Sequence, residues 1–312
     1  MTDAPYFAEI AQGPNGGHAE WLTTSDGVRV RVAHWTTDNA IGTVLLFPGR
    51  TEYIEKYGRD AVSLTDRGFN VLTIDWRGQG IADRLLDNRM LGHVDRFTDY
   101  QRDVQAMVDY ARRIKLPEPF FLIGHSMGGC IGLRALHNAL PVRAAAFSAP
   151  MWGINLGAAI RPVAWAISSL ARPLGINGTL AFGQSEDTYV AVNPFAGNNL
   201  TTDEDMYNYM RDQLRAQPDL ALGGPTLGWL FQALNEMYKL RAMPAPQTPA
   251  IVLLGSDEKI VDSKCVRYVA NKWPGQALVE YDGGLHEILM ERPEIRIDAF
   301  DRIAEHFRAH AS

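Results

Sequence analysis

Residues 124–128 read Gly-His-Ser-Met-Gly, directly after the apolar run Phe120-Phe121-Leu122-Ile123 and before a helical pattern over residues 130–140. An apolar run bounded by glycine predicts a short buried strand, which places Ser126 at a sharp strand-to-helix turn. A serine hydroxyl at such a tip stands clear of its own backbone, and the flanking glycines remove side chains that would collide there. Taken alone, the five residues 124–128 would also fit a glycine-rich loop that happens to contain a serine. The strand before the turn and the helix after it favour a nucleophilic serine.

Strands and helices alternate on both sides of this turn. Residues 18–35 predict a hairpin around Ser25-Asp26-Gly27. Beyond it we expect strands at 43–47, 70–75, 120–123, 142–147, 250–254 and 277–281, and helices at 55–67, 99–114, 130–140, 263–272 and 296–310. This alternation predicts a mostly parallel central sheet with helices on both faces. A strand, a G-x-S-x-G turn and a helix in such a sheet are the nucleophile elbow of the α/β-hydrolase fold.

The alternation stops after Pro150 and returns near residue 240. The intervening stretch of roughly 90 residues is helical or irregular, which is far longer than an ordinary loop. We therefore expect residues 1–150 to form the first part of the core, 151–240 a helical cap, or lid, and 241–312 the second part. Within the cap, apolar residues recur at helical spacing, and either pack on their own domain or form a face that meets acyl chains or a lipid surface. These residues are Leu156, Ile160, Val163, Ile167 and Leu170.

Composition narrows the class of protein. The 312 residues are 46% hydrophobic and 21% charged with a net charge of −6, which disfavours a disordered chain and a nucleic-acid partner. The two cysteines, Cys130 and Cys265, cannot form a disulfide framework, and we expect each as a small apolar residue on a helix. The first twelve residues resemble no signal peptide, and no uncharged apolar run is long enough to span a membrane. We expect a cytoplasmic enzyme, with contact to the inner membrane face through the cap as a further expectation.

A serine nucleophile needs a general base, and the base needs an acid to orient it. In this fold the order along the chain is serine, acid, histidine, each just past the end of a strand. Among eight histidines, His286 alone follows a late strand through a flexible turn, Asp282-Gly283-Gly284. His125 lies inside the elbow, where its side chain is expected to point away from the hydroxyl. The sequence therefore predicts His286 as the base.

The acid comes from the loop after the strand at 250–254, where three carboxylates lie close together. One variable residue and two apolar residues usually follow the acid in this loop, and Lys259-Ile260-Val261 places Glu258 in that frame. Asp257 is one position out of frame and Asp262 lies beyond the apolar pair. Glu258 is the predicted acid, with Asp257 and Asp262 left as alternatives.

Negative charge develops on the substrate oxygen during attack, so backbone N–H groups must point at it. The residue after the nucleophile, Met127, supplies one such donor. The second is expected from the loop after the strand at 43–47, most favourably the N–H of Arg50. Arg50 is alternatively a surface cation whose backbone plays no part. The histidines and cysteines lack the spacing of a metal site, so no metal and no cofactor is expected.

Several stretches together resemble the serine aminopeptidase-like, or hydrolase-4, group of α/β hydrolases, which includes monoacylglycerol lipases and bacterial lysophospholipase L2. The resemblance covers the core and does not extend convincingly through the cap. The loop at Pro48 is closer to the lysophospholipase form, because monoacylglycerol lipases usually have histidine there. The stretches that carry the resemblance are Phe47–Tyr57, Asp75–Gly80, Gly92–Tyr100, Gly124–Gly129 and Tyr281–His286.

The residues predict a serine hydrolase that cleaves a carboxylic ester through an acyl-enzyme. The resemblance implies that the small-molecule substrate is a lipid, either a lysophospholipid or a monoacylglycerol. Two alternatives stay open: a carboxylesterase for small esters, and a ligand-binding protein that has kept the fold without turnover.

Overall fold

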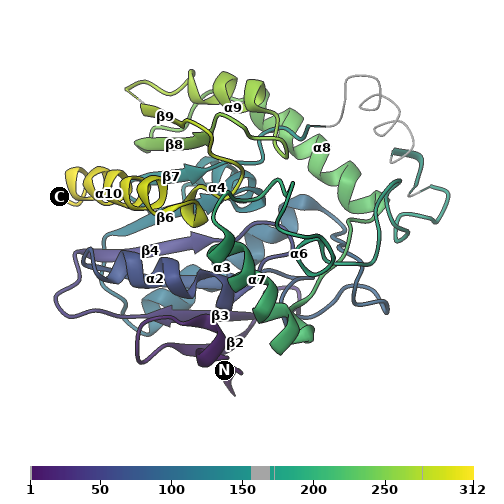
Figure 1. Cartoon of the computed structure of the whole chain (residues 1–312), viewed down its shortest axis with the longest axis horizontal. Helices are drawn as coiled ribbons and strands as arrows, with labels where there is room; N and C mark the ends of the chain where they lie inside the picture. The colour runs from purple at the N-terminus through teal and green to yellow at the C-terminus, as the bar shows by residue number, and fades with distance from the viewer. Residues whose placement is uncertain (1, 156–168, 172, 276) are drawn as a thin grey trace.

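The computed structural model describes residues 2–155, 169–171, 173–275 and 277–312. Its centre is a nine-stranded sheet in the order β1-β2-β3-β5-β4-β6-β7-β8-β9 (Figure 1). The strands are β1 (Thr2–Asp3), β2 (His18–Thr23), β3 (Arg29–Trp35), β4 (Gly42–Phe47), β5 (Phe69–Asp75), β6 (Phe120–His125), β7 (Ala145–Ser148), β8 (Ala250–Gly255) and β9 (Ala277–Tyr281).

Six of these strands run parallel. From β5 through β4, β6, β7 and β8 to β9, every neighbouring pair is parallel, whereas β1, β2 and β3 form an antiparallel edge. Leu45 of β4, for example, pairs with Leu72 of β5 on one side and with Leu122 of β6 on the other. Parallel strands end at the same edge of a sheet, so the loops after β4, β6, β8 and β9 meet there.

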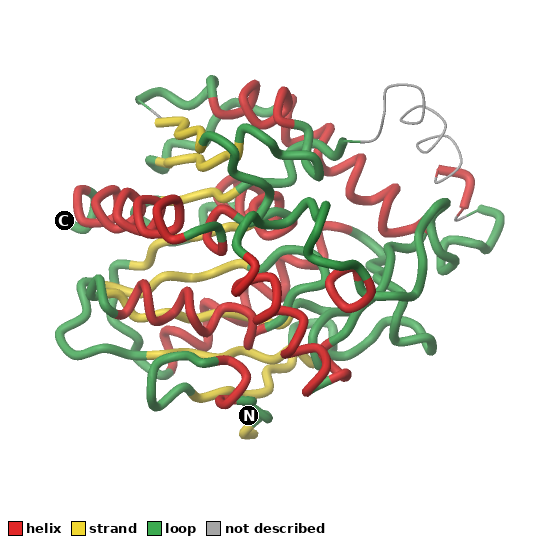
Figure 2. Tube along the Cα trace, viewed as in Figure 1, coloured by secondary structure: helices red, strands yellow, loops and turns green. Residues whose placement is uncertain are grey.

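Helices cover both faces of the sheet (Figure 2). The α-helices are α1 (Ala8–Ala11), α2 (Gly58–Thr65), α3 (Tyr100–Arg113), α4 (Met127–His137), α6 (Tyr189–Val192), α7 (Glu204–Ala216), α8 (Leu227–Ala242), α9 (Ser263–Ala270) and α10 (Pro293–Ala309). Short 3-10 helices lie at η1 (Ile54–Tyr57), η2 (Phe97–Asp99), η3 (Pro218–Leu220) and η4 (Ile288–Met290). The predicted parallel sheet flanked by helices is confirmed.

Strand side chains alternate between two apolar layers. Leu45 and Phe47 pack with α3, α4, α8 and α9, whereas Val44 and Leu46 pack with α2 and α10 on the other face. Since successive strand residues point to opposite faces, a strand such as β4, all of whose residues are buried, must be covered on both sides. This burial explains why the parallel strands read as continuous apolar runs.

The helix boundaries differ from the predictions in two informative places. The helix expected at 55–67 begins as the 3-10 turn η1 and becomes regular only at Gly58. Helix α4 begins at Met127, three residues before the expected start, because the chain passes from strand to helix at Ser126 alone. The strand β1 and the short helix α1 were not predicted from the sequence.

The segment between β7 and β8 contains α6, α7 and α8. Helix α8 packs on the same face as α3 and α4, and Trp229 Nε1 donates to Tyr100 Oη at 3.2 Å. Helix α7 lies beside η1, where Tyr53 Oη donates to Gln213 Oε1 at 3.0 Å. The apolar stripe predicted at 156–170 falls outside the described residues except for Leu170, which is exposed. Among the residues described, no helix is long and apolar enough to cross a membrane.

Candidate active site

Ser126 occupies the single-residue turn between β6 and α4. Its backbone has φ 48° and ψ −116°, a region that non-glycine residues rarely adopt. The turn is held by its own hydrogen bonds, since Ser126 N donates to Ser148 O at 3.0 Å and Met151 N donates to Ser126 O at 2.8 Å. A strained backbone that the surroundings enforce is typical of a functional site. The structure therefore has the turn that the sequence predicted at this position.

Two glycines permit this turn because neighbouring backbone leaves no room for a side chain. A Cβ added at Gly128 would overlap the carbonyl oxygen of Phe47, at the end of β4. A Cβ added at Gly124 would lie 2.9 Å from the carbonyl oxygen of Gly128 across the turn. Both positions are closer than real Cβ contacts, so the close approach of β4, β6 and α4 depends on glycine.

His286 and Glu258 meet at the carboxyl ends of β8 and β9. His286 Nδ1 lies 2.7 Å from Glu258 Oε2, and both side chains are almost fully buried. The other carboxylate oxygen, Oε1, accepts from Ile260 N at 2.6 Å and from Val261 N at 3.1 Å. These bonds fix the carboxylate, so Glu258 holds the imidazole by Nδ1 and leaves Nε2 available for the cavity.

The pair shifts both pKa values in opposite directions. Burial alone would raise the pKa of Glu258, but the charge and hydrogen bond of His286 and the two amide donors outweigh it, so the pKa lies below its usual value. Burial alone would lower the pKa of His286, but the charge and hydrogen bond of Glu258, together with the charges of Glu287 and Glu52, outweigh burial and hold the pKa above its usual value. A carboxylate that stays ionised beside a histidine stabilises the imidazolium that forms when the histidine accepts a proton.

The two alternative acids lie elsewhere. Asp257 is exposed, and its Oδ1 accepts from Ser256 Oγ at 3.1 Å. Asp262 caps α9, accepting from Lys264 N at 3.0 Å and Cys265 N at 3.3 Å. Of the three carboxylates left open by the sequence, Glu258 is the one that contacts His286.

In the loop after β4, one backbone N–H group without an acceptor lies between two that donate hydrogen bonds. Gly49 N donates to the Glu52 carboxylate, and Thr51 N donates to Gln79 Oε1 at 3.1 Å. Within the described part of the chain, the N–H of Arg50 between them has no acceptor. Met127, in turn, is the first residue of α4, where N–H groups have no partner within the helix. Both amides predicted for the oxyanion hole are therefore available for a ligand.

Hydrogen bonds from the loop after β5 hold the loop after β4 in place. Trp76 Nε1 donates to Pro48 O at 3.0 Å, and Gln79 Nε2 donates to Gly49 O at 3.0 Å. Asp75 accepts from Ile54 N at 2.8 Å, which fixes the start of η1. The stretch Asp75–Gly80 thus has a structural role, because it holds the backbone that carries the Arg50 amide.

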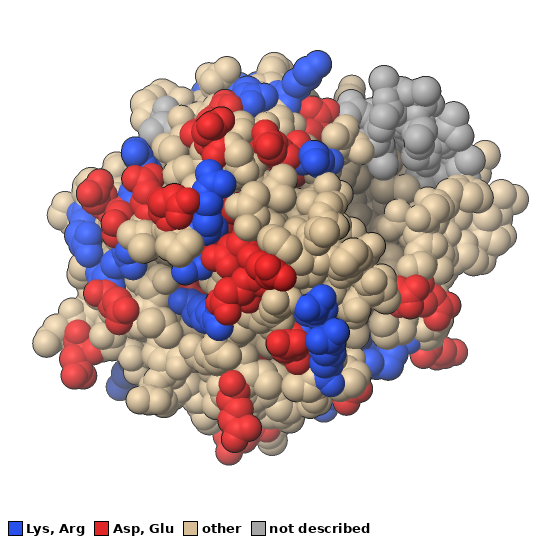
Figure 3. All heavy atoms as spheres, in the orientation of Figure 1, with Lys and Arg blue, Asp and Glu red and all other residues tan. Residues whose placement is uncertain are grey.

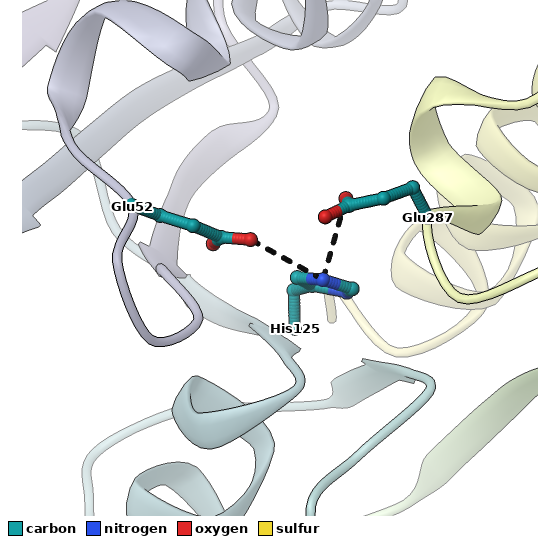
Figure 4. Close-up of side chains that lie close together, drawn as sticks. All are labelled: Glu52, His125 and Glu287. Carbon is teal, nitrogen blue, oxygen red and sulfur yellow. Dashed lines mark ion pairs between the residues drawn. The ribbon is translucent and has the colours of Figure 1, made fainter. Parts of the chain in front are cut away.

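A buried charged cluster joins the loop after β4, the end of β6 and the histidine loop, and the sequence did not reveal it (Figure 4). His125 Nε2 lies 3.4 Å from Glu52 Oε1 and 3.3 Å from Glu287 Oε2. Lys56 Nζ donates to the same two carboxylates at 2.7 and 2.8 Å. The only sequence signals were the i,i+4 spacing of Glu52 and Lys56 and the position of Glu287 next to His286.

The three residues Glu52, His125 and Glu287 have their ligand atoms within 4.8 Å of one another, close enough to hold a metal ion. The ammonium of Lys56 already contacts both carboxylates. This ammonium therefore supplies the positive charge that a metal ion would otherwise bring to the two buried carboxylates. The arrangement therefore fits a salt-bridged positioning cluster, in which the His125 ring lies against His286 with a centroid separation of 4.9 Å.

Ser126 and His286 line the same cavity of about 300 Å³. Its walls come from the loop after β4, the elbow, the histidine loop and the segment between β7 and β8. Polar and apolar side chains share the lining, among them Arg50, Gln184, Tyr189, Leu200, Met210 and Leu214. A cavity of this size with a few convergent polar groups is typical of a small-molecule site.

A buried serine elbow, a histidine–carboxylate pair and two free amides at the carboxyl edge of a parallel sheet define an α/β hydrolase of the serine type. Residues 38–293 match the Hydrolase_4 family model, described as serine aminopeptidase, S33, and the chain belongs to this family.

Relatives of known name support this assignment. Lysophospholipase L2 of Escherichia coli K12 is 32% identical, covering 98% of this chain and 93% of that protein. The monoglyceride lipase of Homo sapiens is 25% identical, over 90% of this chain and 88% of that protein. The fold also matches a soluble variant of monoglyceride lipase from Saccharomyces cerevisiae bound to a substrate analogue, with a TM-score of 0.75 and 21% identity, over 99% of this chain and 100% of that one. The expected fold and family resemblance are confirmed.

Proposed function

We propose that this protein is a serine hydrolase that cleaves carboxylic esters of lipids, with Ser126 as nucleophile, His286 as general base and Glu258 as the acid. The observation that carries the proposal is the buried contact between His286 Nδ1 and Glu258 Oε2 beside a cavity that Ser126 shares. A histidine fixed at Nδ1 by a carboxylate presents Nε2 as a base to a serine hydroxyl.

In the proposed reaction, Ser126 Oγ attacks the ester carbonyl carbon while His286 Nε2 takes the hydroxyl proton. The developing oxyanion accepts from the N–H groups of Arg50 and Met127. When the tetrahedral intermediate collapses, the bond to the alcohol oxygen breaks, and His286 gives its proton to the leaving alcohol. Water then attacks the acyl-enzyme with His286 again as base, which releases the fatty acid and restores Ser126.

The lipid assignment rests on the names of the relatives, a lysophospholipase and a monoglyceride lipase. We propose that residues 151–240 act as the cap and form the part of the cavity wall that contacts the acyl chain. Tyr189, Leu200 and Met210 from this range line the cavity. Exposed apolar side chains at Leu174, Phe182 and Val192 favour contact of the cap with a lipid surface, and a cytoplasmic location stays a prediction.

The decisive test is covalent labelling by a fluorophosphonate probe. The wild-type protein should label, and Ser126→Ala should abolish labelling and lower kcat for a lauroyl ester by about a thousandfold or more. Ser63→Ala is the control, because the Ser63 hydroxyl bonds Arg59 O on helix α2, away from the cavity. Labelling that persists in Ser126→Ala would refute the nucleophile.

A panel of esters with acetyl, butyryl, lauroyl and oleoyl chains then tests the substrate class, with fatty acid release as the readout. Preference for the long chains is the expected result. A maximum at acetyl or butyryl would refute the lipid assignment and favour the small-ester carboxylesterase.

A further inference from the structure

Glu52 lies at the centre of the buried charged cluster, where its carboxylate contacts both the loop after β4 and the end of β6. Its Oε2 accepts from Gly49 N in the same loop and from Tyr57 Oη of η1. Its Oε1 accepts from Lys56 Nζ at 2.7 Å and lies 3.4 Å from His125 Nε2. Only 7% of the residue is exposed, so these contacts take the place of hydrogen bonds to water.

The cluster holds three residues that are each the direct neighbour of a residue with a proposed catalytic role. The pairs are Gly49 beside Arg50, His125 beside Ser126, and Glu287 beside His286. Lys56 carries the connection to the third pair, because its Nζ donates to Glu52 at 2.7 Å and to Glu287 at 2.8 Å. In Figure 4 the two carboxylates approach the His125 ring from two different loops. The loop after β4, the elbow and the histidine loop are therefore joined one residue away from the proposed chemistry.

Two of the three joined segments have no regular secondary structure of their own. The chain between β4 and η1, and between β9 and η4, is in neither a helix nor a strand. Hydrogen bonds from Trp76 and Gln79 hold the loop after β4 to the loop after β5, whereas Glu52 connects it to the elbow and to the histidine loop. Charge-assisted hydrogen bonds in a buried site are strong, so they can keep such segments in one arrangement.

We propose that Glu52 is a positioning residue that sets the relative placement of the oxyanion donors, Ser126 and His286. The inference rests on the proposed function and deepens it. Glu52 lines the cavity, but its oxygens already accept three hydrogen bonds within the protein, which favours a role in holding these groups over one in binding substrate. Because misplacing reacting groups by about 1 Å can lower a rate by about a hundredfold, the effect of Glu52 should fall on kcat.

The first test is Glu52→Gln, which keeps the size of the side chain. A glutamine has one carbonyl oxygen and a donor-only NH2 group, so it cannot accept from Gly49 N on one side and from Lys56 Nζ on the other. For a lauroyl ester, kcat should fall by about 10- to 100-fold, while KM should change by less than about threefold, as for an interaction that matters only in the transition state.

A pair of inhibitors separates the transition state from the bound substrate. With a trifluoromethyl ketone that carries a dodecyl chain, Ser126 Oγ bonds to the carbonyl carbon, its proton passes to His286 and the negative charge forms on the ketone oxygen. The adduct needs all the positioned groups, whereas the matching methyl ketone binds as an intact ketone. Glu52→Gln should raise the inhibition constant of the trifluoromethyl ketone by about 10- to 100-fold and that of the methyl ketone by less than about threefold.

Glu55→Gln is the matched control on the same 3-10 helix. Glu55 is also buried, and it accepts from Arg31 Nη1 and Nη2 at 2.8 and 2.7 Å, but within the described part of the chain it does not line the cavity. Both substitutions remove one carboxylate from a buried cation, so both should lower the free energy of unfolding in urea. Only Glu52→Gln should lower kcat.

An equal loss of kcat in Glu55→Gln would overturn the inference, and so would a higher KM with unchanged kcat or an equal rise of both inhibition constants. Should Glu52→Gln fail to fold, as judged by circular dichroism, Glu287→Gln replaces it with the same expectations, because it breaks the bond from Lys56 to the histidine loop. A wild-type protein that the fluorophosphonate probe does not label would refute the proposed function. Normal labelling with unchanged kcat in Glu52→Gln would refute this inference alone.

Discussion

The imidazole of His286 is constrained on two sides. Glu258 binds Nδ1, and the His125 ring packs beside the imidazole, with the ring centroids 4.9 Å apart and the planes tilted by 57°. Because Glu258 and the nearby carboxylates of Glu287 and Glu52 together outweigh the cost of burial, the pKa of His286 lies above its usual value. A general base must be neutral to accept a proton, so the activity of the proposed site depends on pH through this one residue.

Glu258→Gln should therefore change the pH profile as well as the rate. In the wild type we expect kcat/KM to rise with pH through a His286 pKa above the usual histidine value. Without the carboxylate the pKa falls, so the rising limb should move to lower pH, while kcat drops by about a thousandfold or more. Asp257→Asn, on an exposed neighbour, is the control and should change neither quantity. A limb that stays in place in Glu258→Gln would contradict the assignment of the acid.

At the scale of elements, the site depends on how closely strand β6 and helix α4 approach strand β4. The elbow brings the first turn of α4 against the carbonyl of Phe47, and Gly128 is the residue that permits this contact. Side chains of α4 further along, including Ile131 and Leu136, pack into the apolar layer on that face of the sheet. Tight packing of this kind transmits any displacement of α4 directly to Ser126.

Gly128→Ala should therefore lower both stability and activity. The added methyl group overlaps backbone that cannot rotate away, so we expect a loss of about 3 kcal/mol in the free energy of unfolding, measured by urea denaturation. Gly132→Ala, on the same helix, is the control. Its added Cβ meets the flexible end of Leu122 at 3.0 Å, and alanine favours the helix, so the change should be much smaller. Equal losses in the two variants would contradict the special role of Gly128 at the elbow.

At the scale of the whole molecule, segments far apart in the sequence meet at one edge of the sheet. Lys56 joins Glu52, in the loop after β4, to Glu287, which lies in the histidine loop 231 positions beyond Lys56. On the face of the molecule seen in Figure 3, acidic and basic side chains are interspersed in small groups. The buried cluster is thus a specific connection between two loops of the proposed site.

Lys56→Met should weaken that connection. Removing the ammonium leaves two buried carboxylates without their shared partner, so the free energy of unfolding should fall by about 3–5 kcal/mol. Lys239→Met, on the exposed side of α8, should have little effect on chemical denaturation. A loss below about 1 kcal/mol in Lys56→Met would indicate that water or rearranged side chains replace the bridge.

The local order of residues was enough to predict the parallel sheet and the turn at Ser126, because strand and helix periodicity and glycine placement are local properties. It also singled out His286 by its position after a late strand. The sequence favoured Glu258 over Asp257 and Asp262 by its frame in the acid loop, but the contact itself appeared only in three dimensions, since which carboxylate meets His286 depends on how the loops after β8 and β9 converge. The Glu52–Lys56–Glu287 cluster likewise appeared only in the folded chain, because ion pairing of this kind arises from contacts between distant segments.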